Sequence, residues 1–262
     1  MNTFAKEKRK AKERFASYVS DYDMNDAKIS LKAVHTYKVA ELCETIATSL
    51  ALGEEERFIA WMCGLLHDIG RFEQVTRYNT FVDSESIDHA LLSTQILFGE
   101  EGITTGILRN FIEITDYDDI LYKAILYHSA YHIPDDLTEQ EKMYCNILRD
   151  ADKIDIFRVN LETPMEEIYN TTTEELYNSE VTPEVLLAFM EHHAVLRSLK
   201  KTPVDHVVGH MALFFELVYP RSRELALKQG YLKELSQFES RCPKTQKIFE
   251  AIRCELGIDE LG

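Results

Sequence analysis

Apolar residues recur every three or four positions along most of this chain, and no other feature limits its fold so strongly. Within residues 29–52 they stand at Leu31, Val34, Val39, Leu42, Cys43, Ile46 and Leu50. That spacing places them on one face of an α-helix, whereas a half-buried strand would alternate apolar and polar residues. No stretch alternates in that way. The sequence therefore predicts an all-α fold, a helical bundle.

The same spacing predicts the other helices and the breaks between them. Helices are expected at 54–66, 86–98, 102–114, 119–128, 138–158, 183–199 and 203–218, with one or two more between 220 and 262. Residues 71–85 hold Asn79, Asp83 and Ser84, which predict a loop. The polar stretch 163–182 predicts a linker or short helices. We expect a helical domain at 1–160 and a helical extension at 161–262, packed on the same core.

Charge and cysteine content exclude several classes of protein. The formal net charge is −16, and such a field repels polymeric nucleic acid. The five cysteines are scattered and form no C-x-x-C pair, which is typical of a reducing compartment rather than of a disulfide framework or zinc ribbon. No segment approaches the ~20 apolar residues of a membrane span, and residues 1–15 lack the apolar core of a secretory signal. These features predict a cytoplasmic protein without a membrane partner.

Histidine and aspartate residues on separate predicted helices suggest a metal site. His67 and Asp68 are adjacent at the end of the 54–66 helix, and His35 lies one helix earlier. Asp152 lies on the 138–158 helix. Imidazole and carboxylate together suit Zn, Mn, Fe, Co or Ni, and ligands from three helices can hold one ion inside a bundle.

Two further histidines predict a second ion. His89 and His128 fall between Asp68 and Asp152, each beside apolar helix positions. If Asp68 bridges, His35, His67 and Asp152 serve one ion, and His89 and His128 the other. His132, four residues after His128, could take the place of His128.

The order of these residues resembles the HD superfamily of metal-dependent phosphohydrolases. The stretch from Gly64 to Arg71 (GLLHDIGR) is similar to the central motif of that family, and Arg149 to Asp155 (RDADKID) to its closing motif. His89 and His128 match the extra ligands of the two-metal branch. The resemblance covers residues 29–157, about half of the chain. It implies two divalent ions (Fe, Mn, Zn, Co or Ni, with Mg also compatible) and hydrolysis of a small phosphorylated molecule, most simply a nucleotide.

Three basic residues are candidates for binding the substrate phosphate. Arg71 follows His67 by four residues and offers a bidentate fork, and related two-metal enzymes carry a basic residue there. An ion pair of Arg71 with Glu73 or Asp83 is an equal alternative. Lys32, one turn before His35, and Lys153, beside Asp152, are weaker candidates.

Other histidines and acids have simpler interpretations. His206 and His210 have metal-ligand spacing but no accompanying motif, so we expect a structural role. His192 and His193 stand in a polar context and are expected to be exposed. Asp155 or Glu73 could orient a ligand or pass a proton.

The pattern leaves the substrate and two other functions open. The Gly-Tyr-Pro motif of the HD branch that cleaves cyclic di-GMP does not follow His128, and Gly70-Arg71-Phe72 departs from the pattern of ppGpp hydrolases. Some HD proteins use a similar ligand set to hold two irons and act as oxygenases. A regulatory module with an inactive site is a further alternative. The oligomeric state is not predicted.

Overall fold

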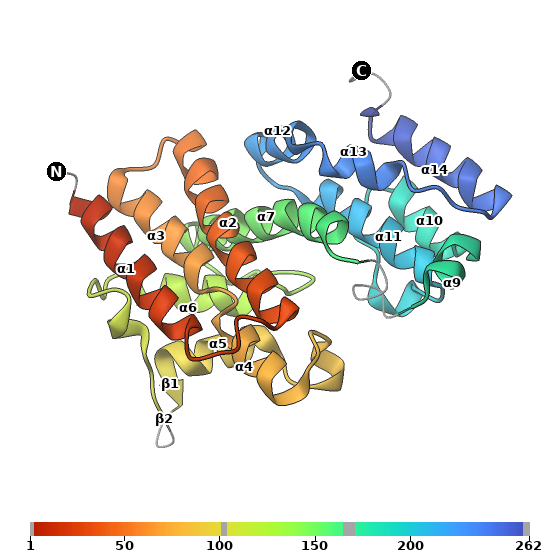
Figure 1. Cartoon of the computed structure of the whole chain (residues 1–262). Coiled ribbons are helices and arrows are strands. Elements are labelled where there is room, and N and C mark those ends of the chain that lie inside the picture. Colours follow the sequence, from red (N-terminus) through yellow and green to blue (C-terminus); the bar gives the residue numbers. More distant parts are fainter. Residues whose placement is uncertain (1–2, 101–103, 165–170, 259–262) are drawn as a thin grey trace. The chain divides into compact units, whose positions relative to one another are not determined.

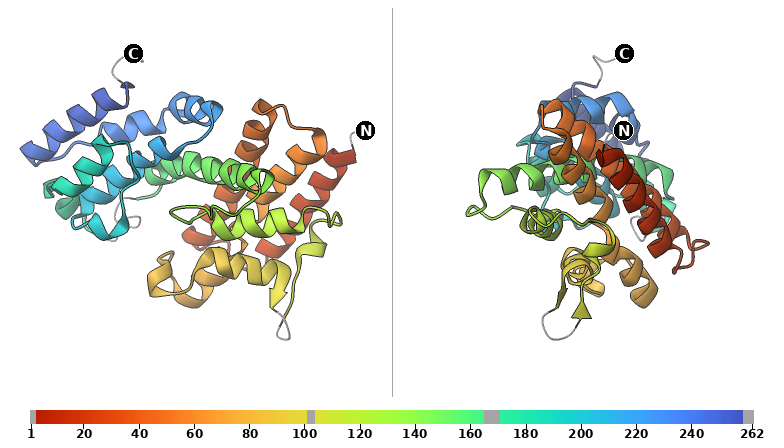
Figure 2. Two further views of the ribbon diagram at one scale, coloured as in Figure 1. Left: turned by 180° about the vertical axis from the view of Figure 1, so that it is seen from behind. Right: turned by 90° about the vertical axis from the view of Figure 1, so that its left-hand side faces the viewer.

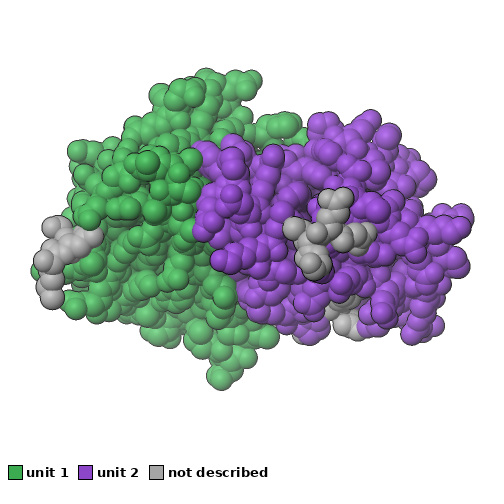
Figure 3. Space-filling view, turned by 90° about the horizontal axis from the view of Figure 1, so that it is seen from above, with its two compact units in different colours: residues 1–152 green, residues 153–262 purple. Residues whose placement is uncertain are grey.

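The computed structural model describes residues 3–100, 104–164 and 171–258. It divides into two compact units, residues 1–152 and 153–262 (Figure 3). Helices dominate both, so the all-α prediction is confirmed. The elements of the first unit are α1 (Thr3–Val19), α2 (Ala27–Ser49), α3 (Glu54–Leu66), α4 (Ile69–Tyr78), η1 (Asp83–Glu85), α5 (His89–Phe98), β1 (Gly99–Glu100), β2 (Thr104–Thr105), η2 (Leu108–Asn110), α6 (Asp118–Tyr127) and the first part of α7 (Glu139–Glu162). The 1–160 and 161–262 division stays a prediction.

Helices α1, α2 and α3 lie side by side in the first unit (Figures 1 and 2). Gly64 lets α3 approach the backbone of α2 closely, because a Cβ there would lie 2.5 Å from Ala40 Cα. Trp61, Phe58 and Phe15 are almost completely buried. Burying such large apolar surfaces provides the main stabilisation of this unit.

Helix α4 is a correction to the sequence prediction, which expected a loop over residues 71–85. Ile69, Phe72 and Val75 are spaced by three residues and are all buried, so they form one apolar helix face. The Phe72 ring packs against Phe15, with ring centroids 5.9 Å apart. The helix ends at Asn79, in the left-handed conformation (φ 53°), and only the residues after it form the expected loop, with η1 inside it.

The predicted helix at 102–114 is wrong over its described part, residues 104–114. Thr104–Thr105 instead pairs antiparallel with Gly99–Glu100, and Leu108–Asn110 forms a single 3₁₀ turn. Gly106 returns so close to α5 that a Cβ there would lie 2.3 Å from the Leu97 carbonyl oxygen. Such a close approach requires glycine. Residues 102–103 lie outside the described residues.

The second unit begins within α7 and is also helical. Its further elements are α9 (Thr173–Asn178), α10 (Pro183–Met190), η3 (Arg197–Leu199), α11 (Pro203–Ala212), η4 (Leu213–Glu216), α12 (Pro220–Gln229), α13 (Tyr231–Ser236) and α14 (Pro243–Glu255). The helix expected at 183–199 ends early, before His192 turns left-handed (φ 61°). Gly230, also left-handed, separates α12 from α13, so the C-terminal region holds more helices than expected.

Among the described residues, no helix is both long enough and apolar enough to cross a bilayer.

We expect Gly64→Ala to destabilise the protein. The new Cβ would meet Ala40 backbone atoms at 2.5 and 2.7 Å, and backbone cannot move aside as a side chain can. Overpacking of this kind costs about 1–3 kcal/mol, which urea denaturation would measure. Gly53→Ala is the control, because its Cβ would meet only the flexible Glu56 carboxylate at 3.3 Å. Equal stability of the two variants would contradict close α2–α3 packing.

Candidate metal centre

The structure brings together the side chains that the sequence predicts as metal ligands. They come from α2 (His35), the α3–α4 junction (His67 and Asp68), the start of α5 (His89), the end of α6 (His128) and the middle of α7 (Asp152). The histidines and Asp68 are at most 4 % exposed. Asp152 is 16 % exposed at its side chain. Polar groups so deeply buried require partners.

The two carboxylate oxygens of Asp68 face different sets of partners. Oδ2 lies 3.7 Å from His35 Nε2 and 3.3 Å from His67 Nε2. Oδ1 lies 3.6 Å from His89 Nε2 and 3.7 Å from His128 Nε2. Asp68 therefore stands between two groups of nitrogen donors.

Asp152 completes the first group. Its Oδ1 lies 3.0 Å from His35 Nε2 and 3.8 Å from His67 Nε2. Donor atoms of His35, His67 and Asp152 all lie within 4.8 Å of one another, and so do those of His67, Asp68 and His128. Both sets have the size of a single-ion site.

Hydrogen bonds to Nδ1 determine which ring nitrogen faces the centre. His67 Nδ1 donates to the Gly64 carbonyl oxygen at 2.8 Å, and His128 Nδ1 donates to the Ile125 carbonyl oxygen at 2.6 Å. A carbonyl can only accept, so each Nδ1 carries a proton, and in the neutral form of the ring the lone pair then lies on Nε2. His89 Nδ1 is bound 2.7 Å from Asp83 Oδ2, which gives the same orientation.

These lone pairs and oxygens fit a bound cation. His89 Nε2 and His128 Nε2 are 3.0 Å apart, and nitrogens that share an ion at about 2.1 Å stand roughly 3.0–3.4 Å apart. His67 Nε2 and Asp68 Oδ1 are buried and make no hydrogen bond. Two lone pairs at this separation repel each other, and a divalent ion would convert the repulsion into coordination.

Neighbouring basic groups and hydrogen bonds hold both acids of the centre ionised. Burial opposes ionisation of Asp68, but Lys32, His67 and Arg71 more than offset it and hold its pKa well below the usual range. Burial likewise opposes ionisation of Asp152, and His35 and His67 outweigh it and lower its pKa. These are the protonation states that metal ligands need.

Burial lowers the pKa values of His89 and His128. Burial, with the neighbouring His89 and His67, lowers the pKa of His128 from 6.5 to about 3. Burial and the Arg71 charge lower the pKa of His89 despite the nearby Asp83.

Local packing places His89 and His128. A Cβ on Gly70 would lie 2.7 Å from Ser93 N and 2.9 Å from the His89 carbonyl oxygen, so glycine lets α4 contact the backbone of α5. The Arg149 guanidinium donates to the carbonyl oxygens of Tyr127 (3.1 Å) and His128 (3.3 Å), which fixes the end of α6.

Of the predicted phosphate-binding residues, Lys32 and Arg71 reach the centre. Lys32 Nζ lies 2.6 Å from Asp68 Oδ2, and Arg71 Nε lies 3.6 Å from Asp68 Oδ1. Arg71 Nη1 also pairs with Asp83 Oδ1 at 3.0 Å, the ion pair considered as the alternative. Lys153 follows Asp152 on α7 and is half-buried.

None of the other candidates joins a possible metal cluster among the described residues, and some of them have other partners. His132 is exposed and joins none of the possible metal clusters among the described residues. His206 and His210 lie on α11 of the second unit. Asp155 pairs with Arg158 at 2.7 Å, and Glu73 pairs with Arg77 and accepts from Tyr22 at 3.2 Å.

Sequence reasoning missed Gln74 and the contact of Asp83 with His89. Gln74 is completely buried and donates to Asp83 Oδ1 at 2.9 Å. Gln74 is a single amide residue within the segment 71–85 that the sequence predicts as a loop. Nothing else in the sequence marks it as a buried residue.

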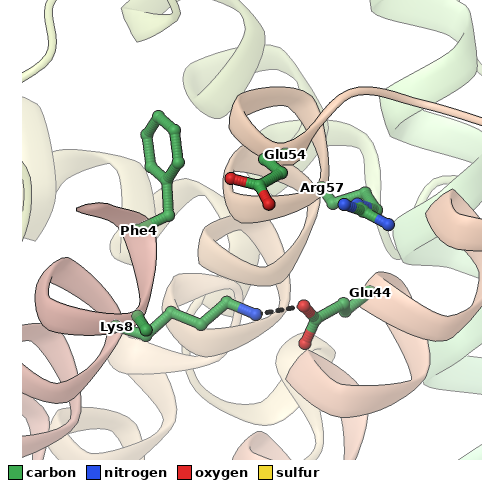
Figure 4. Close-up of a pocket in the computed structure, with 6 residues that line it drawn as sticks. Phe4, Lys8, Glu44, Glu54 and Arg57 are labelled. Atoms are coloured by element: carbon green, nitrogen blue, oxygen red, sulfur yellow. Dashed lines mark hydrogen bonds and ion pairs between the residues drawn. The ribbon is translucent and has the colours of Figure 1, made fainter. Parts of the chain in front are cut away.

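A surface pocket of about 220 Å³ lies elsewhere in the first unit (Figure 4). Lys8 and Glu44 form an ion pair in it, and Phe4, Glu54 and Arg57 surround them. None of the candidate ligands lines it.

Comparison with known proteins agrees with the geometry. The family model of the HD domain matches residues 33–157, a stretch that contains all the candidate ligands. Residues 33–157 therefore carry an HD domain. No curated protein and no solved structure matches the chain.

Acidification should destabilise the metal-free protein. The pKa of His128 is about 3 in the folded state, against 6.5 for an unperturbed histidine, so the unfolded chain takes up the proton first. The free energy of unfolding should therefore fall as the pH drops from 6.5 toward 3. His128→Gln should flatten that slope in denaturant titrations at successive pH values. The exposed His132→Gln should leave it unchanged, and equal slopes in both variants would contradict a neutral buried His128.

Proposed function

We propose that this protein is a metal-dependent phosphohydrolase that cleaves an ester or diester of a small phosphorylated molecule. The proposal depends mainly on Asp68, whose two oxygens face His35 and His67 on one side and His89 and His128 on the other. The HD domain at residues 33–157 supports the same class of reaction.

The ligand set suits two divalent ions of the Fe, Mn, Zn, Co or Ni type, because imidazole and carboxylate are mixed in it. His35, His67 and Asp152 would hold one ion, and His89 and His128 the other, with Asp68 between them. Bound there, the ions would act as Lewis acids toward the phosphate and lower the pKa of a water molecule.

The chain's own residues would orient the substrate and stabilise its charge. Lys32 and Arg71 contribute positive charge at opposite oxygens of Asp68, so a phosphate beside the centre would lie between two cations. Arg71 is anchored through Nη1, which donates to Gln74 Oε1 at 2.6 Å and to the Phe81 carbonyl oxygen at 2.8 Å. Its other terminal nitrogen makes no hydrogen bond to the described residues and can meet a phosphate oxygen.

Exposure indicates the side from which a substrate would enter. Lys32 and Asp152 are 17 % and 16 % exposed at their side chains, and Asp83 is 32 % exposed. The histidines behind them are nearly inaccessible. In a chain of net charge −16, local cations and bound ions beside these more exposed side chains would attract a phosphorylated molecule. A nucleotide is the simplest candidate.

Removal of Asp68 should abolish both metal binding and hydrolysis. Asp68→Asn and Asp68→Ala should lose both ions, because each ion would lose an anionic ligand. His89→Ala or His128→Ala should mainly lose one. Metal analysis of the purified proteins, with hydrolysis of phosphomonoesters, phosphodiesters and nucleotides, would measure this.

The exposed His132→Gln is the control and should keep full metal content and activity. Full metal content in Asp68→Asn would refute the bridging role. Metal-dependent oxygen uptake without phosphate release would instead indicate an oxygenase, and an inert metal-loaded protein would indicate a binding module.

Lys32→Gln should impair hydrolysis without loss of metal. A hydrogen bond to a charged group contributes about 1.5–3 kcal/mol, which predicts a fall in kcat/KM of roughly 10-fold or more. Lys28→Gln is the matched control on the same helix, because Lys28 Nζ makes an exposed hydrogen bond to Asn79 Oδ1 at 3.1 Å. An unchanged kcat/KM in Lys32→Gln would exclude the phosphate role.

Substitution of Arg71 should also impair hydrolysis. Arg71→Ala should lower the rate strongly, and Arg71→Lys should restore part of it, since a point charge cannot reproduce the guanidinium fork. Steady-state kinetics would measure both. Equal rates for Arg71→Ala and the unmodified protein would assign Arg71 a purely structural role.

A further inference from the structure

The loop between α4 and α5, residues 79–88, is fixed from its buried side by Gln74. The two protons on Gln74 Nε2 face three acceptors, Asp83 Oδ1, Ser86 Oγ and the Ile87 carbonyl oxygen, each at 2.9 Å, so one proton is shared between two of them. Its Oε1 accepts from Arg71 Nη1 at 2.6 Å. A completely buried amide with all its groups satisfied is costly to rearrange, so the loop has one preferred conformation.

This arrangement orients the carboxylate of Asp83. Oδ1 accepts from Gln74 Nε2 at 2.9 Å and from Arg71 Nη1 at 3.0 Å. Oδ2 is left for His89 Nδ1, at 2.7 Å. Burial alone would raise the pKa of Asp83, but His89 and Arg71 outweigh it and lower the pKa to about 2. Asp83 is thus an oriented anion.

Asp83 differs from the groups that hold the neighbouring histidines. The Nδ1 atoms of His67 and His128 donate to neutral carbonyl oxygens three residues earlier in their own helices. His89 stands at the first position of α5, and its Nδ1 bonds to a charged side chain from a loop. A carboxylate partner both fixes the ring and makes the opposite nitrogen a stronger donor.

We propose that Asp83 is a positioning residue for His89, supported by Gln74 and Arg71, and that it sets the affinity of the ion held by His89 and His128. This inference rests on the metal-dependent function proposed above. In this proposal the loop affects mainly the ion held by His89 and His128, because no described contact links Asp83 to His35, His67 or Asp152. One ion site depends on the loop and the other does not.

The first test is metal titration of the full-length protein. Asp83→Asn keeps the shape of the side chain and removes its charge, and loss of such a partner typically costs 10–100-fold in metal affinity. Isothermal titration with Mn²⁺ or Zn²⁺ should show one of two binding steps weakened to that extent and the other retained. Glu85→Gln is the matched control, since it makes the same charge change on an exposed residue of η1.

The second test uses metal-free protein and so does not depend on the proposed function. Nitrogen-15 NMR of the histidine rings should show His89 protonated at Nδ1 in the unmodified protein and in Glu85→Gln. In Asp83→Asn the His89 ring should shift toward a mixture of tautomers, while the rings of His67 and His128 should keep their protons on Nδ1. If Asp83 had only a structural role, its substitution would not change the tautomer ratio of His89 alone.

The outcomes separate the two proposals. Unmodified protein that binds no metal, yet shows the His89 ring change in Asp83→Asn, would overturn the proposed function and retain the positioning role. Two unchanged binding steps and an unchanged His89 ring in Asp83→Asn would overturn the positioning role alone. If Asp83→Asn unfolds, Gln74→Met provides the second test: it keeps Asp83 but removes the amide that donates to Asp83 Oδ1. It should weaken the same binding step to a smaller extent, and an unchanged titration would refute the proposal.

Discussion

The buried negative charge of Asp68 is the constraint on which the centre of this protein depends. An isolated carboxylate inside a protein is strongly unfavourable, and Asp68 is only 2 % exposed. Its position at the α3–α4 junction requires positive or hydrogen-bonding groups on both of its oxygens. Lys32 from α2 and Arg71 from α4 provide charge, and histidines from separate helices face the same two atoms. The helices are therefore arranged around one carboxylate as much as around an apolar core.

Such an arrangement works only where the helix backbones can approach closely. Gly64 brings α3 against α2, and Gly70 brings α4 against α5. Either contact, if widened by a side chain, would move a histidine away from Asp68. Burial of large apolar side chains on the same helices, such as Trp61 and Phe72, offsets the cost of placing so many polar groups together. Packing and chemistry are thus specified by neighbouring positions of the same segments.

Much of this centre could be predicted from sequence because its ligands are tied to helix positions. His67-Asp68 stands where the apolar pattern of α3 ends, and Asp152 stands inside that of α7, so periodicity alone places them on helices. Helix α4 was missed because Gly70 suggests a break, whereas it serves close packing inside a helix. The bend after α5 was missed because it depends on the close approach of Gly106 to the backbone at the end of α5. Asp83 could not be assigned to His89, since its orientation depends on Gln74, a contact that only the folded chain creates.

The hydrogen bonds from His67 and His128 to carbonyl oxygens of their own helices have a consequence for folding. Each bond spans three residues, so it can form as soon as the helix does. The choice of the nitrogen that stays unprotonated is then made within one helix and needs no contact with another helix. For His128, whose pKa lies far below neutrality, capture of an ion at neutral pH would displace almost no proton from the ring. Any dependence of the heat of such capture on the ionisation enthalpy of the buffer would therefore come from groups other than the His128 ring.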